Sequence, residues 1–183
     1  GIREDRLGYV IGPALSETDP ALPETPPDGA VAELCPQACA IAMKLGDALV
    51  RRGGAILIVD YGRDGNPGDS LQAVNDHRAV DPFEAPGEAD LSHWVDFAAL
   101  ASAVRSAGAR LVGPVPQGRF LMQIGLGARA EQAGLNAEPE VRRDLLSAVD
   151  RLTSPAQMGE VFKVALLLPP GEGEPPGFMQ EEV

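Results

Sequence analysis

An acidic and an aromatic side chain follow directly after the most apolar run of the chain. Residues 55–59 read Ala-Ile-Leu-Ile-Val, and Asp60, Tyr61 and Gly62 come next. Such a run predicts a central parallel strand covered on both faces, and ligands of open α/β sheets bind outside the carboxyl ends of such strands. Asp60 can accept hydrogen bonds from a ligand or cap a loop amide, and Tyr61 can stack on a ligand or cover the sheet end.

The next segment, residues 63–94, is rich in polar side chains and has little periodicity. We expect an irregular loop of about 30 residues above the strand end, acting as a lid or facing a substrate. His77 in this loop can serve as a general base. The alternative is a solvated histidine or one hydrogen-bonded to the backbone, which is the commoner role of a lone loop histidine.

Other chemistries receive little support from the sequence. Cys35 and Cys39 are four residues apart in a predicted helix, where disulfide geometry is seldom reached. No metal site is expected, because His77 and His93 lack a compact ligand pattern. Residues 125–130 match a dinucleotide-binding fingerprint, but the second strand and its acid are missing, so an ordinary strand-to-helix turn is favoured. A nucleophilic serine motif is absent.

Alternating helical and strand patterns must position these residues. They predict an α/β fold with a mostly parallel sheet and an antiparallel hairpin at one side. A weak strand at residues 6–12 and a Pro-rich loop at residues 13–29 precede them, and a Pro/Gly-rich end that frays follows. The expected elements are a helix from Pro36 to Gly53, a helix capped by Asp96 and ended by Gly108, hairpin strands at 110–115 and 120–124, a helix at 141–152 and a strand at 161–168.

Composition excludes several classes of partner. The 183 residues suit one domain. The formal net charge of -12 disfavours nucleic acid, because a polyanion would repel this chain. No apolar run approaches the roughly 20 residues of a membrane helix. No secretion segment is recognised, so a cytoplasmic location is expected.

Several motifs, in order along nearly the whole chain, resemble the MidA-type methyltransferases. They include the Gly-Gly-Ala-Ile-Leu-Ile-Val-Asp-Tyr-Gly run, the Gly-Asp-Ser-Leu-Gln run and the Met-Gly-Glu-Val-Phe-Lys-Val run. The matching positions are residues 53–62, 68–74, 77, 81–83, 86–92, 95–97, 113–114, 117–121 and 158–164.

This resemblance implies a Rossmann-like class I methyltransferase that uses S-adenosylmethionine. Mitochondrial members of the family methylate an arginine of a respiratory complex I subunit during assembly, so a protein substrate is implied. The carboxylates of the loop would then hold a guanidinium group, although they can equally form a solvated surface. The residues carried over are Asp60 and His77 as catalytic, Asp60, Tyr61 and Gly62 for the cofactor, and Gln72, Asp81 and Asp90 for the substrate.

The resemblance covers the second half of the family's domain. The glycine-rich loop that holds the cofactor in the family has no match here, so residues 1–183 are expected to be a partial domain that is inactive alone. The missing N-terminal half is the expected partner, and a homo-oligomer remains open. The alternative is a protein-interaction module that keeps the fold without catalysis.

Overall fold

The computed structural model describes residues 2–3, 6–13, 28–65, 68–171 and 173–179. The chain divides into a small unit, residues 1–34 and 66–95, and a large unit, residues 35–65 and 96–183. Each unit is described by itself. Helices and strands are interspersed along the chain, and the predicted α/β class is confirmed. No helix in these ranges is long and apolar enough to cross a membrane.

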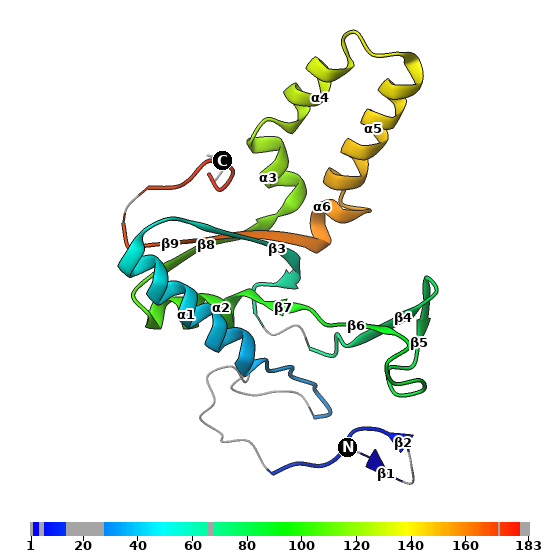
Figure 1. Ribbon diagram of the computed structural model, residues 1–183, viewed down its shortest axis with the longest axis vertical. Coiled ribbons are helices and arrows are strands. Elements are labelled where there is room, and N and C mark those ends of the chain that lie inside the picture. The colour runs from blue at the N-terminus through cyan, green and yellow to red at the C-terminus, as the bar shows by residue number, and fades with distance from the viewer. Residues whose placement is uncertain (1, 4–5, 14–27, 66–67, 172, 180–183) are drawn as a thin grey trace. The chain divides into compact units, whose positions relative to one another are not determined.

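Four strands form the main sheet, in the order β7-β3-β9-β8. β9 lies between β3 and β8 and runs antiparallel to both (Figure 1). The strand predicted at the end of the chain therefore connects two strands that are distant in sequence. The bounds are β3 Ile56–Arg63, β7 Val95–Asp96, β8 Arg110–Pro116 and β9 Phe162–Leu168.

On the edge that pairs with β9, β3 is antiparallel rather than parallel as predicted, and one of its faces is only partly covered. Residues 56–61 pair in antiparallel register with residues 162–167 of β9. Leu57 is 51% exposed and Val59 is 47% exposed, while the residues that alternate with them are half-buried. An apolar run records a tendency toward burial but not the direction of its neighbour. The described helices cover one face of β3.

Helices α1 (Pro36–Arg52) and α2 (Phe97–Ser106) lie on one face of the sheet, as Figure 1 shows. Both were predicted, with their ends. Pro36 occupies the first turn of α1, where a missing N–H costs nothing, and Gly53 ends the helix at a φ of 71°. The Asp96 carboxylate accepts a hydrogen bond of 2.9 Å from the Ala99 N–H and caps α2.

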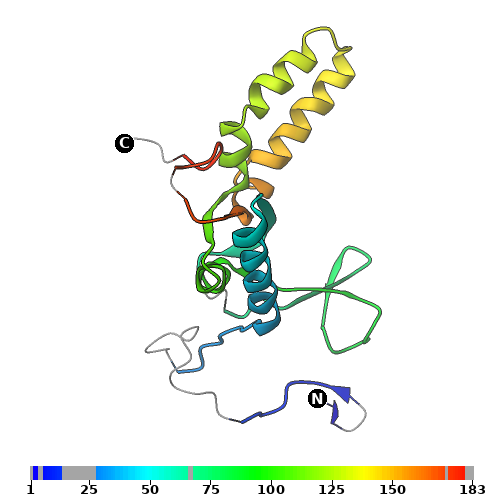
Figure 2. The same ribbon diagram turned by 60° about the vertical axis from the view of Figure 1, so that its left-hand side comes forward.

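Four further helices follow β8 in the large unit. α4 and α5 form an antiparallel helical hairpin that extends away from the sheet, which is clearest in Figure 2. Arg142 of α5 closes its tip, because Nε and Nη2 donate to the Gly134 carbonyl at 3.1 and 2.7 Å. The bounds are α3 Gln117–Gln123, α4 Leu126–Gly134, α5 Pro139–Thr153 and α6 Met158–Val161.

The predicted hairpin strand at residues 120–124 is wrong, because residues 120–123 belong to α3 and Ile124 is its C-cap. A short apolar run fits either a strand or a helix, and the neighbour of β8 is β9 instead. The antiparallel pair expected at the side of the sheet therefore exists with a different second strand. Residues 125–130 follow a helix rather than a strand, so they lack the strand-to-helix geometry of the dinucleotide fingerprint.

The segment before the C-terminus packs on α3, although we expected it to fray. Phe178 is 4% exposed, and its ring centroid lies 5.3 Å from that of Phe120. Arg119 Nη2 and Gln123 Nε2 donate hydrogen bonds of 2.7 and 2.9 Å to the Met179 carbonyl. Apolar burial of the Phe178 ring therefore fixes this end of the described chain.

The small unit corrects the expectation that residues 63–94 are irregular. It contains a three-stranded antiparallel sheet in the order β5-β4-β6. These strands are short and lack clear alternation, so no periodicity marks them. β2 pairs antiparallel with β1 and is shorter than the strand predicted at 6–12, and most of the Pro-rich loop at 13–29 lies outside the described residues. The bounds are β1 Ile2–Arg3, β2 Arg6–Leu7, β4 Gln72–Asn75, β5 Arg78–Val80 and β6 Asp90–Ser92.

Candidate functional site

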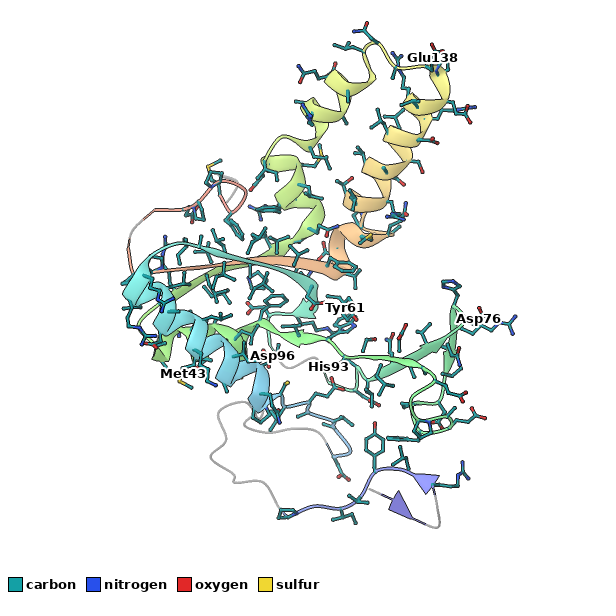
Figure 3. The ribbon with its side chains drawn as sticks, viewed as in Figure 1. Met43, Tyr61, Asp76, His93, Asp96 and Glu138 are labelled. Atoms are coloured by element: carbon teal, nitrogen blue, oxygen red, sulfur yellow. The ribbon has the colours of Figure 1, made fainter. Side chains whose placement is uncertain are left out.

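Asp60, Tyr61 and Gly62 occupy the last part of β3, where the sequence placed them. The half-buried Asp60 accepts a 2.8 Å hydrogen bond from the Tyr61 N–H through Oδ1. The Tyr61 ring packs edge-on against Phe162 of β9, with centroids 5.5 Å apart (Figure 3). The backbone contact fixes the Asp60 carboxylate, and the ring contact covers the strand end.

Gln72 and Asp90 lie on one face of the small sheet. Gln72 pairs with Ser92, and Val74 pairs with Asp90. Side chains two residues apart on a strand share a face, so Gln72 and Asp90 are diagonal neighbours across β4 and β6. Both residues are exposed. The structure thus brings together two of the three residues predicted to bind the substrate.

The third of these, Asp81, lines a pocket of about 240 Å³ in the small unit. Its Oδ1 accepts a 2.8 Å hydrogen bond from the Phe83 N–H, which fixes the carboxylate in a local turn. Asp81 and Glu84 give the pocket two carboxylates, and its alanines and valine give it an apolar wall. The pocket is lined by Asn75, Val80, Asp81, Glu84, Ala85 and Ala89.

His77 lies in the turn between β4 and β5. Asp76 and His77 have φ values of 47° and 60°, which suits a two-residue hairpin turn in the left-handed region. Figure 3 shows Asp76 at this tip. His77 is exposed. The turn gives His77 a structural role, and its role as a general base stays a prediction.

The predicted site residues are divided between the two units. Asp60, Tyr61 and Gly62 belong to the large unit, whereas Gln72, His77, Asp81 and Asp90 belong to the small unit. A single site that combines both sets remains a prediction.

One acidic side chain that the sequence analysis did not single out is Glu33. Its carboxylate accepts hydrogen bonds from the N–H groups of Ser70 and Leu71 and from the Ser70 hydroxyl. These partners are 37 and 38 residues away along the chain, so no local pattern could reveal them.

The two cysteines are free thiols, as expected. Burial raises the pKa of the Cys39 thiol, and the neighbouring Cys35 and Asp96 raise it further. A raised pKa lowers the fraction of nucleophilic thiolate near neutral pH. Among the described residues, no three histidine, cysteine or acidic side chains are grouped closely enough to hold a metal ion.

Two family motifs meet around the end of α5. A Cβ atom on Gly118 would lie 2.3 Å from the Thr153 carbonyl oxygen, and a Cβ atom on Gly159 would lie 2.0 Å from it. Gln117, which is 6% exposed, donates a 2.9 Å hydrogen bond to the Leu152 carbonyl. These motif residues therefore have a packing role, since only glycine permits such close approach of backbone.

Comparison with known proteins identifies the family. Residues 3–115 match the sequence model of the family described as "Putative S-adenosyl-L-methionine-dependent methyltransferase". The chain belongs to this family. The resemblance noted from the motifs is thereby confirmed.

Relatives named protein arginine methyltransferase NDUFAF7, mitochondrial, are similar to this chain. The human protein is 36% identical over 166 residues, which are 90% of this chain and 37% of that protein. The zebrafish protein, from Danio rerio, is 38% identical over 133 residues, or 72% of this chain and 31% of that protein. The chain thus spans well under half the length of these relatives.

Solved structures support the methyltransferase fold. A COG1565 superfamily protein from Burkholderia thailandensis has 29% identity and a TM-score of 0.62, over 78% of this chain and 37% of that one. A second member from the same organism, bound to S-adenosyl-homocysteine, has 30% identity and a TM-score of 0.60, over 78% of this chain and 36% of that one. The predicted fold class is confirmed over the matched part.

Proposed function

We propose that this chain is part of a protein arginine methyltransferase that uses S-adenosylmethionine. The observation that carries the proposal is the similarity to relatives of that name along 90% of this chain, together with the family match. The likeness to a structure bound to S-adenosyl-homocysteine supports the choice of methyl donor.

The end of β3 fits part of this cofactor. The Asp60 carboxylate can accept hydrogen bonds from ribose hydroxyls or an ammonium group, and the Tyr61 ring and the buried Gly62 give it an aromatic, close-packed surrounding. The glycine-rich loop of the family has no counterpart in residues 1–183. When bound, S-adenosylmethionine supplies an electrophilic methyl group on a sulfonium.

The small unit fits a cationic acceptor. Asp81 and Glu84 can hold a guanidinium group by charge-assisted hydrogen bonds, and the exposed Gln72 and Asp90 can bind the polypeptide around it. The guanidinium nitrogen loses a proton when it gains a methyl group, and His77 is the proposed acceptor of that proton. Correct alignment supplies much of the rate, so these residues orient the nitrogen rather than attack it.

The test compares Asp60→Asn with Asp64→Asn in the full-length protein, because residues 1–183 alone are expected to be inactive. Asp60 is half-buried and hydrogen-bonded, whereas Asp64 is exposed. A lost charge-assisted hydrogen bond costs about 1.5–3 kcal/mol, so Asp60→Asn lowers the rate roughly tenfold to hundredfold. The neutral change at the exposed Asp64 leaves most activity. The assay measures transfer of a labelled methyl group to arginine, with respiratory complex I from cells lacking this protein as acceptor.

Equal rates for both folded variants would mean that Asp60 caps a loop and is not part of the site. No methyl transfer by the unsubstituted protein, with intact binding to complex I, would favour the interaction module instead. A role in complex I assembly, a cytoplasmic location and a homo-oligomer remain proposals. The named animal relatives are mitochondrial.

A further inference from the structure

The Glu33 carboxylate joins three separate segments of the small unit. Its Oε1 accepts hydrogen bonds from the Ser70 N–H at 3.1 Å and the Leu71 N–H at 3.0 Å, and its Oε2 accepts from the Ser70 hydroxyl. The Ser70 hydroxyl oxygen in turn accepts a 2.9 Å hydrogen bond from the Trp94 N–H. We call Glu33, Ser70, Leu71 and Trp94 the carboxylate clasp.

The residues of the clasp lie close in sequence to the points where the chain passes between the two units. The chain passes between the units after residues 34, 65 and 95. Glu33 and Trp94 immediately precede two of these points, and Ser70 follows the third by a few residues. The clasp therefore links residues near all three connections of the small unit, through the Glu33 carboxylate and the Ser70 hydroxyl.

The clasp also precedes the strand that leads to the acidic pocket. β4 begins at Gln72, directly after Leu71, and ends at Asn75, which lines the pocket with Asp81 and Glu84. Two backbone N–H bonds to one carboxylate oxygen fix both the position and the direction of the chain as it enters β4. Ser70 is only 7% exposed, so little water is available to replace these contacts.

We infer that Glu33 is a positioning residue for the proposed methyl transfer: it fixes the chain where it enters β4 and thereby the side chains of the acidic pocket within the small unit. The inference rests on the proposed function, because it concerns the acceptor pocket of that same reaction. Glu33 itself need not touch the acceptor or the methyl donor.

The test uses Glu33→Ala, Glu33→Gln and the control Glu88→Ala in the purified full-length protein, because residues 1–183 alone are expected to be inactive. Glu88 is an exposed acid of the same unit. A glutamine keeps one oxygen to accept both N–H groups, and its amide can donate to the Ser70 hydroxyl oxygen. Displacement of a reacting group by about 1 Å costs on the order of a hundredfold in rate. We therefore expect Glu33→Ala to lower kcat at least tenfold, with KM for S-adenosylmethionine nearly unchanged, and Glu33→Gln to recover most of kcat.

Kinetics of Glu33→Ala equal to those of Glu88→Ala would overturn the inference, and so would a folded Glu33→Gln that is as impaired as Glu33→Ala. If Glu33→Ala does not fold, Ser70→Ala takes its place, since it removes the hydroxyl link to Trp94 and keeps both N–H donors to Glu33. A smaller loss of kcat is then expected, and an unchanged kcat would refute the inference.

A second measurement separates this inference from the proposed function. Amide hydrogen exchange at Ser70, Leu71 and Trp94 needs no activity, and we expect faster exchange in Glu33→Ala than in Glu88→Ala. Equal exchange rates would show that the clasp does not hold these amides. If the unsubstituted protein transfers no methyl group but its Ser70, Leu71 and Trp94 amides exchange slowly, the proposed function and the positioning role are both refuted. The hydrogen bonds of the clasp would still be supported by that result.

Discussion

Replacement of Gly118 by alanine tests the packing role of the two glycines at the end of α5. The added Cβ would lie 2.3 Å from the Thr153 carbonyl oxygen and 3.0 Å from its carbonyl carbon, whereas ordinary contacts begin at 3.4 Å. Backbone atoms must therefore move by about 1 Å, since no flexible side chain is there to give way. The same movement strains the 2.9 Å hydrogen bond from Gln117 to the Leu152 carbonyl.

The magnitude follows from these two effects. Overpacking in a close-packed region costs about 1–3 kcal/mol, and a buried amide left without its partner costs about 1–3 kcal/mol more. We expect Gly118→Ala to lower the free energy of unfolding by about 3 kcal/mol or more. The measurement is urea unfolding of the purified protein, followed by circular dichroism.

Gly127→Ala is the matched control, because Gly127 also lies in a helix. The neighbour of its added Cβ is the methyl end of Met122, at 3.1 Å, which can rotate away. Alanine favours a helix by about 1 kcal/mol over glycine, so this variant should be unchanged or slightly more stable. Similar unfolding midpoints for both variants would refute the argument that the Thr153 carbonyl leaves no room at Gly118.

Two further predictions concern a thiol and the C-terminal segment. Burial, Cys35 and Asp96 raise the pKa of the Cys39 thiol, so Cys39 should react with iodoacetamide more slowly than Cys35 near pH 7.5, and its reaction should become faster at more alkaline pH. Peptide mass spectrometry measures both rates, and a faster reaction at Cys39 than at Cys35 would contradict this prediction. Phe178→Ala should destabilise the protein by about 3 kcal/mol, because it removes a buried ring packed on α3. Met179→Ala, which shortens a side chain that is 55% exposed, should change stability by less than about 0.5 kcal/mol, and equal effects of the two substitutions in thermal unfolding would show that the segment is not packed.

Local signals in the sequence were sufficient for several elements. Pro36 and Gly53 mark the ends of α1 because they act through their own backbone conformation. Asp96 marks the start of α2 because its side chain bonds to an amide three residues ahead. The apolar runs of β3 and β9 were likewise predicted, and Asp60 was placed at the end of a strand.

Features decided by distant partners could not be predicted. Residues 120–124 have an apolar pattern that suits a strand, and their helical state depends on β9 pairing with β8 and on Phe178 packing against Phe120. Neither apolar run indicates whether β9 pairs parallel or antiparallel with β3. Glu33 was not predicted for the same reason, because its carboxylate accepts hydrogen bonds from amides 37 and 38 residues away.

Substitutions along the helical hairpin of α4 and α5 should have unequal effects on stability. None of the residues of α5 is buried, and in α4 only Gly134 is. Most changes along the hairpin should therefore cost little stability. At its base, however, two glycines and a buried glutamine close around the carbonyls of Leu152 and Thr153. Over evolutionary time the outer surface of the hairpin is free to diverge between related proteins, while the junction of α5 with α3 and α6 is restricted to a few residue types.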